Sequence, residues 1–302
     1  MDLLISDSKD ALFISQLKVL NDAMSRAQQE LASGKRILNA SDDPGSVPAI
    51  VQNQADLARV EQSQSNLNTL NSEVGMASSD LENAATIMDN ISSIGAEGAT
   101  GTTDAQTRQM LAGQVQDLET QIVGIANSTN EGRYLFGGDD DSTAPYSIDF
   151  ANTPPFTANT TAQATRMGID AMGNTFSIAM TATDIFNNAD PTQNILQSIE
   201  NLRQGLLNND SPAIATAVTQ LSTADQHLSS VQAYYGNAQS TITSALNTAS
   251  TMQLNLQTQQ SQLTDADQAQ VITTEQTAQT QQQAMLEMRA QMPRGSLFDM
   301  LA

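Results

Sequence analysis

The chain has 302 residues, a formal net charge of −21, no cysteine and no tryptophan. The acidic balance argues against a nucleic-acid partner, because phosphate binding needs clustered lysine and arginine, and the lack of cysteine excludes disulfides and thiolate chemistry. Aromatic residues make up 4% of the chain and hydrophobic residues 39%, which favours long helices over one large globular core. No apolar run approaches the ~20 residues that span a bilayer, and no cleavable signal is visible, so no membrane is expected among the partners.

The first predicted element is a helix that carries one apolar stripe. Its apolar residues recur at alternating spacings of three and four, which places them on a single helix face. They are Phe13, Leu17, Leu20, Met24, Ala27 and Leu31. The helix is expected to end at a turn-rich segment that contains Ser41, Asp42, Asp43 and Pro44.

Proline positions outline the helices in the middle of the chain. Two long blocks, residues 49–144 and 213–292, contain no proline. Proline is tolerated in the first turn of a helix but disrupts the helix interior, so both blocks can form long helices. A capping side chain precedes proline at Asp43-Pro44, Asp190-Pro191 and Ser211-Pro212, so a helix is expected to begin at each pair. Within the first block, we expect glycines 95, 98 and 101 to break the helix and Thr103-Asp104 to cap the next one.

The segment that follows Gly132 has a different composition, since seven of the eleven aromatic residues lie between Tyr134 and Phe186. Apolar residues alternate at period two on both sides of residues 170–174. This pattern predicts a hairpin in a small β-rich insert. The alternating residues are Met167 and Ile169 before the turn, and Phe176, Ile178 and Met180 after it.

The second proline-free block is predicted to be helical, and if unbroken it would extend ~120 Å at ~1.5 Å per residue. Twelve glutamines lie between residues 253 and 283, and a helix this polar is marginal by itself, so we expect it to become ordered inside an assembly. An apolar stripe in one register runs through its end. It comprises Val271, Ala278, Met285, Met288 and Met292.

Two half-apolar helices at opposite ends of one chain each need a partner that covers the stripe. We expect them to pair with each other first and then with neighbouring copies. The predicted fold is mainly α, a long antiparallel helical rod or coiled-coil bundle with paired N- and C-terminal helices and a small β-rich inserted domain. The expected domains are a terminal assembly domain (1–43 with 256–302), a helical rod (44–136 with 189–255) and the insert (137–188).

Candidate chemistry is sparse. His227 is the single histidine, so no second imidazole or thiolate exists to complete a zinc site, and we expect a structural role. Asp139, Asp140 and Asp141 lack the spaced ligands and central glycine of a calcium-binding loop, which favours a solvated loop. We therefore predict no catalytic residue, no metal site and no cofactor, and do not expect an enzyme.

Several segments, in order along the chain, carry a family resemblance. Residues 28–37 (QQELASGKRI) resemble the entry helix of bacterial flagellins and their relatives. The turn NASDDP at 39–44 is similar to that of the hook–filament junction proteins of the flagellin family, as are LARVEQ at 57–62 and GRYLFGG at 132–138. The resemblance continues in DAD at 265–267 and SLFDML at 296–301.

This resemblance implies a structural protein that joins the hook to the flagellin filament. The implied partners are hook-associated protein 1 (FlgK), flagellin, further copies in a ring, and a type III export chaperone that masks the C-terminal helix. The implied location is extracellular, after export without a cleaved signal. The assembly interface would be the two stripes together with Leu297 and Leu301, and the turn at Ser41, Asp42, Asp43 and Pro44 would mark a joint between domains.

Two alternatives remain open at this point. One is a flagellin, the filament subunit itself, although the SDDP turn and the YLFGG stretch argue against it. The other, from a different class, is a signalling coiled coil such as a chemoreceptor's cytoplasmic rod, which shares helices rich in alanine, serine and glutamine. The predicted β-rich insert and the absence of a predicted membrane span count against that reading.

Overall fold

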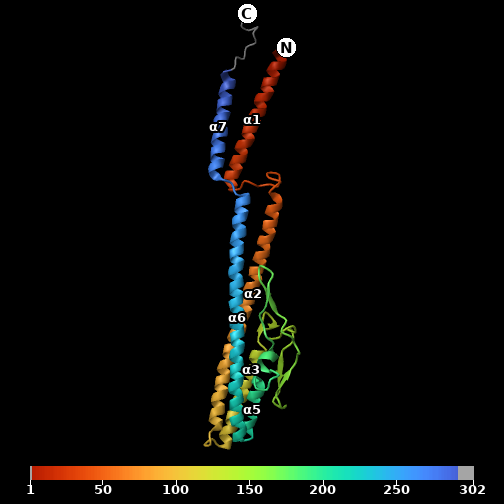
Figure 1. Cartoon of the computed structure of the whole chain (residues 1–302), viewed down its shortest axis with the longest axis vertical. Helices are drawn as coiled ribbons and strands as arrows, with labels where there is room; N and C mark the ends of the chain where they lie inside the picture. Colours follow the sequence, from red (N-terminus) through yellow and green to blue (C-terminus); the bar gives the residue numbers. More distant parts are fainter. Residues whose placement is uncertain (1, 292–302) are drawn as a thin grey trace. The chain divides into compact units, whose positions relative to one another are not determined.

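The computed structural model describes residues 2–291, with side chains from residue 11 onward. Helices dominate the described part of the chain, and short strands lie between the third and fourth of them (Figure 1). The helices are α1 (Asp2–Ser33), α2 (Val47–Ala99), α3 (Ala105–Ala126), α4 (Ala182–Phe186), α5 (Ile195–Leu207), α6 (Ser211–Thr264) and α7 (Gln268–Gln291). The mainly helical fold with paired terminal helices and a strand-containing insert is thereby confirmed.

The strands form three separate antiparallel pairs. The pairs are β1 (Thr129–Asn130) with β2 (Arg133–Tyr134), β3 (Tyr146–Ile148) with β4 (Phe156–Ala158), and β5 (Met167–Ile169) with β6 (Thr175–Ser177). The last pair confirms the predicted hairpin. Asp170 stabilises its turn, because its carboxylate accepts the backbone N–H groups of Met172 and Asn174.

The chain divides into two compact units, which are described separately. The first contains the residues up to Ala58 and those from Gln253 onward, and the second contains Arg59–Met252. These boundaries differ from the three domains expected from the sequence, and that division stays a prediction.

The second unit is built around one apolar core to which both helices and insert contribute. Phe136, next to β2, packs edge-on against Phe186 of α4 and Tyr235 of α6, with ring centroids 5.9 and 6.3 Å apart. Arg166 of the insert forms an ion pair with Glu73 of α2, and both side chains are largely buried. The insert is thus fixed to the helices by aromatic packing and by a paired charge, rather than by a core of its own.

Two expectations about glycine in α2 are wrong. The helix continues through Gly95 and Gly98 and ends at Ala99. A Cβ added at Gly95 would lie 2.8 Å from a methyl group of Val218 on α6, and one at Gly98 would meet Leu206 of α5 even more closely. These glycines therefore permit close helix packing, although glycine inside a helix is less stable than alanine because it loses more backbone entropy on folding.

The structure also locates three helix boundaries. The helical block 213–292 is interrupted, because α6 ends at Thr264 and α7 begins at Gln268. Neither Asp43-Pro44 nor Asp190-Pro191 begins a helix as expected, since α2 begins at Val47, and α5 begins at Ile195 with Asn194 as its N-cap. By contrast, Asp104 caps α3 as predicted, accepting the backbone N–H of Thr107.

Candidate assembly site

Helices α1 and α7 pack side by side in the first unit (Figure 1). The apolar stripes predicted at the two ends of the chain lie in this contact. Ala27, Val271 and Ala278 are buried. The larger stripe residues remain half-buried, namely Phe13, Leu17, Leu20, Met24, Leu31 and Met285. Two helices alone thus cover the stripes only partly.

Polar contacts set the antiparallel register of the pair. Gln282 donates to the side-chain oxygen of Asn21 over 2.7 Å, and about two turns further along, Gln28 donates to Glu275 over 3.4 Å. The sum of the paired residue numbers is constant, as an antiparallel pair requires. Near the far end, the guanidinium of Arg289 lies 5.6 Å from the ring centroid of Phe13, a cation–π contact.

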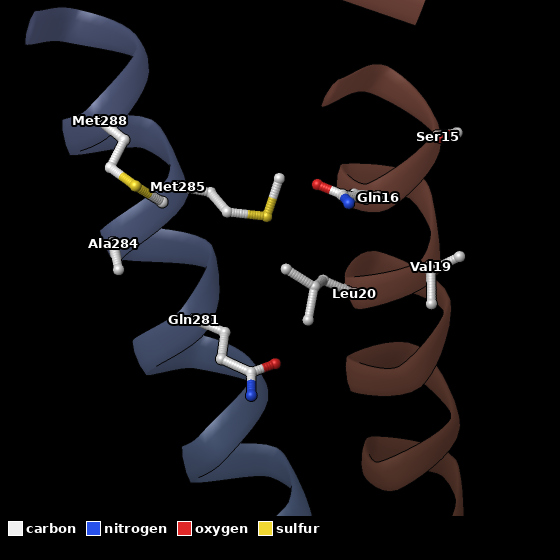
Figure 2. Close-up of a pocket in the computed structure, with 8 residues that line it drawn as sticks. All are labelled: Ser15, Gln16, Val19, Leu20, Gln281, Ala284, Met285 and Met288. Atoms are coloured by element: carbon white, nitrogen blue, oxygen red, sulfur yellow. The ribbon is translucent and has the colours of Figure 1, made fainter. Parts of the chain in front are cut away.

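An apolar groove opens between the two helices where the stripes are least covered. Its volume is about 480 Å³, and Leu20 and Met285 point toward each other across it (Figure 2). Met288, also in its lining, is 59% exposed. The lining comprises Ser15, Gln16, Val19, Leu20, Gln281, Ala284, Met285 and Met288.

Further apolar side chains of the same two helices face outward. Leu12, Ile14 and Leu286 are at least half exposed, and Val19, which also lines the groove, is 66% exposed. Exposed large apolar side chains gathered on one element mark a surface that another molecule covers. The sequence stripe missed these residues, although the spacing of seven between Leu12 and Val19 was a signal for a second apolar face.

Three of the predicted interface residues, Met292, Leu297 and Leu301, lie outside the described residues. For the other ten, the structure gives the positions above, and their use in assembly stays a prediction.

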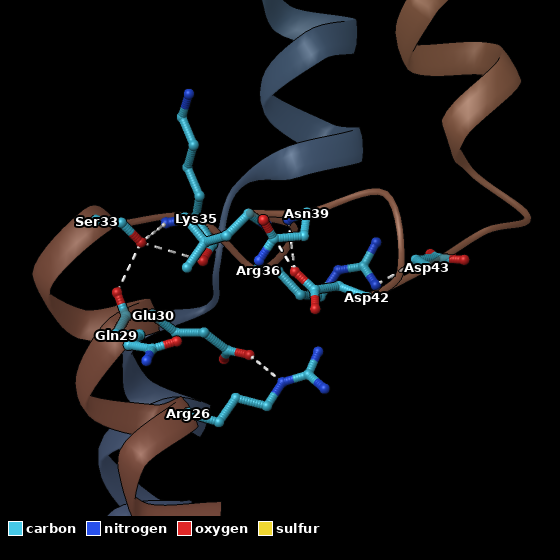
Figure 3. A network of polar contacts seen from close by, with 10 residues as sticks. Arg26, Gln29, Glu30, Ser33, Lys35, Arg36, Asn39, Asp42 and Asp43 are labelled. Atoms are coloured by element: carbon cyan, nitrogen blue, oxygen red, sulfur yellow. Dashed lines mark hydrogen bonds and ion pairs between the residues drawn. The ribbon is translucent and has the colours of Figure 1, made fainter.

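The turn after α1 is shaped by Gly34 and by the carboxylates of Asp42 and Asp43, and Figure 3 shows the two carboxylates. Gly34 has φ of +70° and donates its N–H to the carbonyl of Glu30, which ends the helix. Asp42 accepts the backbone N–H groups of Leu38 and Asn39 at 2.9 and 2.8 Å. Ser41 and Pro44 are exposed, so the two aspartates rather than their neighbours hold the turn.

Asp43 connects this turn to the start of α2 and to the guanidinium of Arg36. Its carboxylate accepts the hydroxyl of Ser46 over 2.7 Å and a guanidinium N–H of Arg36 over 3.2 Å (Figure 3). The pKa of Asp43 lies below its ordinary value because of the Ser46 bond and then the Arg36 bond. The backbone N–H groups of Asn39 and Leu38 lower the pKa of Asp42 in the same way. Both carboxylates therefore stay ionised in their structural role.

The segment after Gly34 runs across the break between α6 and α7. The N–H of Arg36 donates to the carbonyl of Thr264 over 2.7 Å, and the N–H of Ala266 donates to the carbonyl of Gly34 over 2.9 Å. A guanidinium N–H of Arg36 reaches the carbonyl of Leu263 over 3.1 Å. The N-terminal turn and the C-terminal break thus form one hydrogen-bonded crossing, which we call the joint (residues 34–46 with 263–267).

The comparisons with known proteins agree on one family. Residues 13–141 match the bacterial flagellin N-terminal helical region, and residues 206–301 match the bacterial flagellin C-terminal helical region. The chain belongs to the flagellin family. A 125-residue segment of this flagellin-family protein is 32% identical to flagellar hook-associated protein 3 of Escherichia coli strain K12. That match covers 39% of this chain and 38% of the relative, well under two thirds of its length.

Solved structures share the fold of this flagellin-family protein. FlgL of Bacillus cereus aligns with a TM-score of 0.58 at 15% identity, over 70% of this chain and 99% of that one. The flagellar junction protein FlgL of Legionella pneumophila aligns with a TM-score of 0.57 at 14% identity, over 72% and 100%. At these identities the likeness concerns the fold.

The other candidate residues occupy structural positions. A ring nitrogen of His227 lies 3.0 Å from the carbonyl oxygen of Asp184, and Asp139 accepts the backbone N–H of Gln163. Among residues 2–291, no helix combines the length and apolar character needed to cross a bilayer. In the same part of the chain, no group of three acidic or histidine side chains is placed to hold a metal ion.

Proposed function

We propose that this protein is a structural component of the bacterial flagellum that joins the hook to the flagellin filament. The observation that carries the proposal is the α1–α7 pair, which leaves an apolar groove and outward apolar side chains uncovered. The flagellin-family helical regions and the likeness to hook-associated protein 3 support it.

In this proposal, the uncovered side chains of α1 and α7 are buried by neighbouring subunits. Copies of the same chain form a ring, because a repeated head-to-tail contact that closes on itself generates a cyclic assembly. Hook-associated protein 1 contacts one side of the ring and flagellin the other. Before assembly, an export chaperone covers the C-terminal helix, and the protein reaches the outside of the cell through type III export without a cleaved signal.

A complementation assay tests this proposal. A strain that lacks the gene is expected to release flagellin into the medium instead of retaining filaments, and the wild-type gene restores them. We expect the Met288→Asp variant not to restore filaments, since it places a charge in a groove that a neighbouring subunit must cover. Met110→Asp is the matched control, because Met110 has the same 59% exposure but lies on α3 in the second unit. Normal filaments in the deletion strain would contradict the proposal.

A flagellin, the filament subunit itself, is the second candidate, because both flagellin helical regions match. Seeded polymerisation separates the two functions. Flagellin extends seeds into long filaments, whereas a junction protein stops after a short tier. The family assignment leaves no support for the chemoreceptor-like coiled coil.

A further inference from the structure

The break between α6 and α7 contains no helix breaker. It consists of Asp265, Ala266 and Asp267, and neither proline nor glycine occurs between Gly236 and Gln291. Alanine is the best helix former and aspartate is tolerated in a helix at modest cost. Local sequence therefore does not require the chain to leave the helix at this point, and something else in the structure must hold the break open.

The bonds from residues 34–37 take the place of helical bonds at the break. In a continuous helix, the carbonyl of Thr264 would accept the N–H of Gln268, but here it accepts the N–H of Arg36 over 2.7 Å. Likewise the N–H of Ala266, which would donate within the helix, donates to Gly34. On the α7 side, the carboxylate of Asp267 accepts the N–H groups of Ala269 and Gln270, as an N-cap does.

The buried positions on the two sides of the break share one register. Thr264, at the end of α6, is buried, and the buried Val271 and Ala278 of α7 follow it at steps of seven. Seven residues make nearly two full turns of a helix with 3.6 residues per turn, so these three positions would lie on one face of a joined helix. The sequence on both sides of the break is therefore compatible with one continuous helix.

We propose that residues 34–37 act as a latch, and that α6 and α7 join into one continuous helix when this latch leaves. Docking of residues 34–37 takes up the backbone groups of Thr264 and Ala266 and breaks the helix. Their departure lets the helical bonds re-form across residues 264–268. The order of residues 34–37 and the continuity of the C-terminal helix are therefore coupled in one two-state element.

Amide hydrogen exchange on the full chain tests the latch, with Gly34→Ala as the perturbation. Gly34 has positive φ and open space around it, so the variant destabilises the latch through backbone conformation alone. We expect exchange at the Arg36 N–H to rise about five- to thirtyfold. This factor is the free-energy cost of placing a residue with a side chain in the left-handed conformation, converted to a ratio of rates. The Ala266 N–H is expected to stay as slow as in the wild type, because joining supplies a new acceptor. Gly101→Ala, a glycine with open space and no positive φ, is the control.

A second variant prevents joining without disturbing the latched form. Gln268 is the first residue of α7, where proline is tolerated, whereas proline in a continuous helix removes a bond and clashes with the preceding turn. In Gly34→Ala combined with Gln268→Pro, exchange at Arg36 and Ala266 is expected to accelerate together. The proposal is overturned if Gly34→Ala alone accelerates both amides equally, or leaves both unchanged.

Discussion

Glu119 on α3 offers a sharp test of the packing between α3 and α5, through Glu119→Gln. Its side chain is fully buried, and neither carboxylate oxygen has a hydrogen-bond partner among the described residues. Arg203 of α5 is 3.8 Å from one of these oxygens, but it binds Glu200 more closely, at 2.7 and 2.9 Å. One cation thus faces two carboxylates. Burial first, and the charge of Glu200 second, raise the pKa of Glu119 to about 8.

The sign and size of the effect follow from this pKa. Between the ordinary value of 4.5 and about 8, the unfolded chain releases the Glu119 proton while the folded chain keeps it. The free energy of unfolding therefore falls by about 1.4 kcal/mol per pH unit as pH rises through this window, a total of roughly 3–5 kcal/mol. Below pH 4.5 the contribution of Glu119 is fully retained. Glutamine resembles the protonated carboxyl and removes this dependence.

Urea unfolding followed by circular dichroism, at several pH values from 5 to 8, measures the effect. We expect Glu119→Gln to gain stability relative to the wild type steadily as pH rises. Asp117→Asn, an exposed position on the same helix, serves as the control and should leave the difference flat. Parallel pH profiles for wild type and Glu119→Gln would refute the assignment of a protonated, buried carboxyl.

Three further predictions concern packing and charge elsewhere. In thermal unfolding, Gly95→Ala is expected to destabilise the second unit by about 1–3 kcal/mol through overpacking. Gly75→Ala, in open space on the same helix, should stabilise it by about 0.5–1 kcal/mol. Equal effects of the two variants would contradict the close approach of Val218 to Gly95. Arg166→Ala should cost about 3–5 kcal/mol, because Glu73 is left buried without its cation, and unchanged hydrogen exchange in β5 and β6 would contradict it. The pKa of Asp43 is lowered, so the stabilisation that its carboxylate gives the joint is present above the ordinary pKa of 3.8 and is lost as pH falls through the depressed value. Proteolysis in residues 34–46 should therefore accelerate in acid. Asp43→Asn should be cleaved faster than the wild type already at neutral pH.

The terminal helix pair could be predicted from sequence because its signal is local and periodic. The residues of the α1 stripe recur at helical spacing, and the structure places them against α7. The outward face containing Val19 and Leu286 was missed. Its signal in the sequence, the single spacing of seven between Leu12 and Val19, is too short a series to predict a second apolar face.

The break at Asp265 and the continuity of α2 could not be predicted in the same way. The break depends on bonds to Gly34 and Arg36, which are more than two hundred residues distant in sequence. Gly95 carries the same local signal whether it ends a helix or permits a close approach, and only the position of Val218 distinguishes the two. Both features are decided by tertiary contacts, which override local propensity.

The role of the α1–α7 surface in assembly is tested most directly by the accessibility of one position before and after assembly. The chain has no cysteine, so Val19→Cys provides a single thiol on the most exposed of these apolar positions. We expect a maleimide probe to react readily with the purified protein and hardly at all within isolated hook–filament complexes. Equal labelling of the thiol in both would contradict burial of this surface by neighbouring subunits.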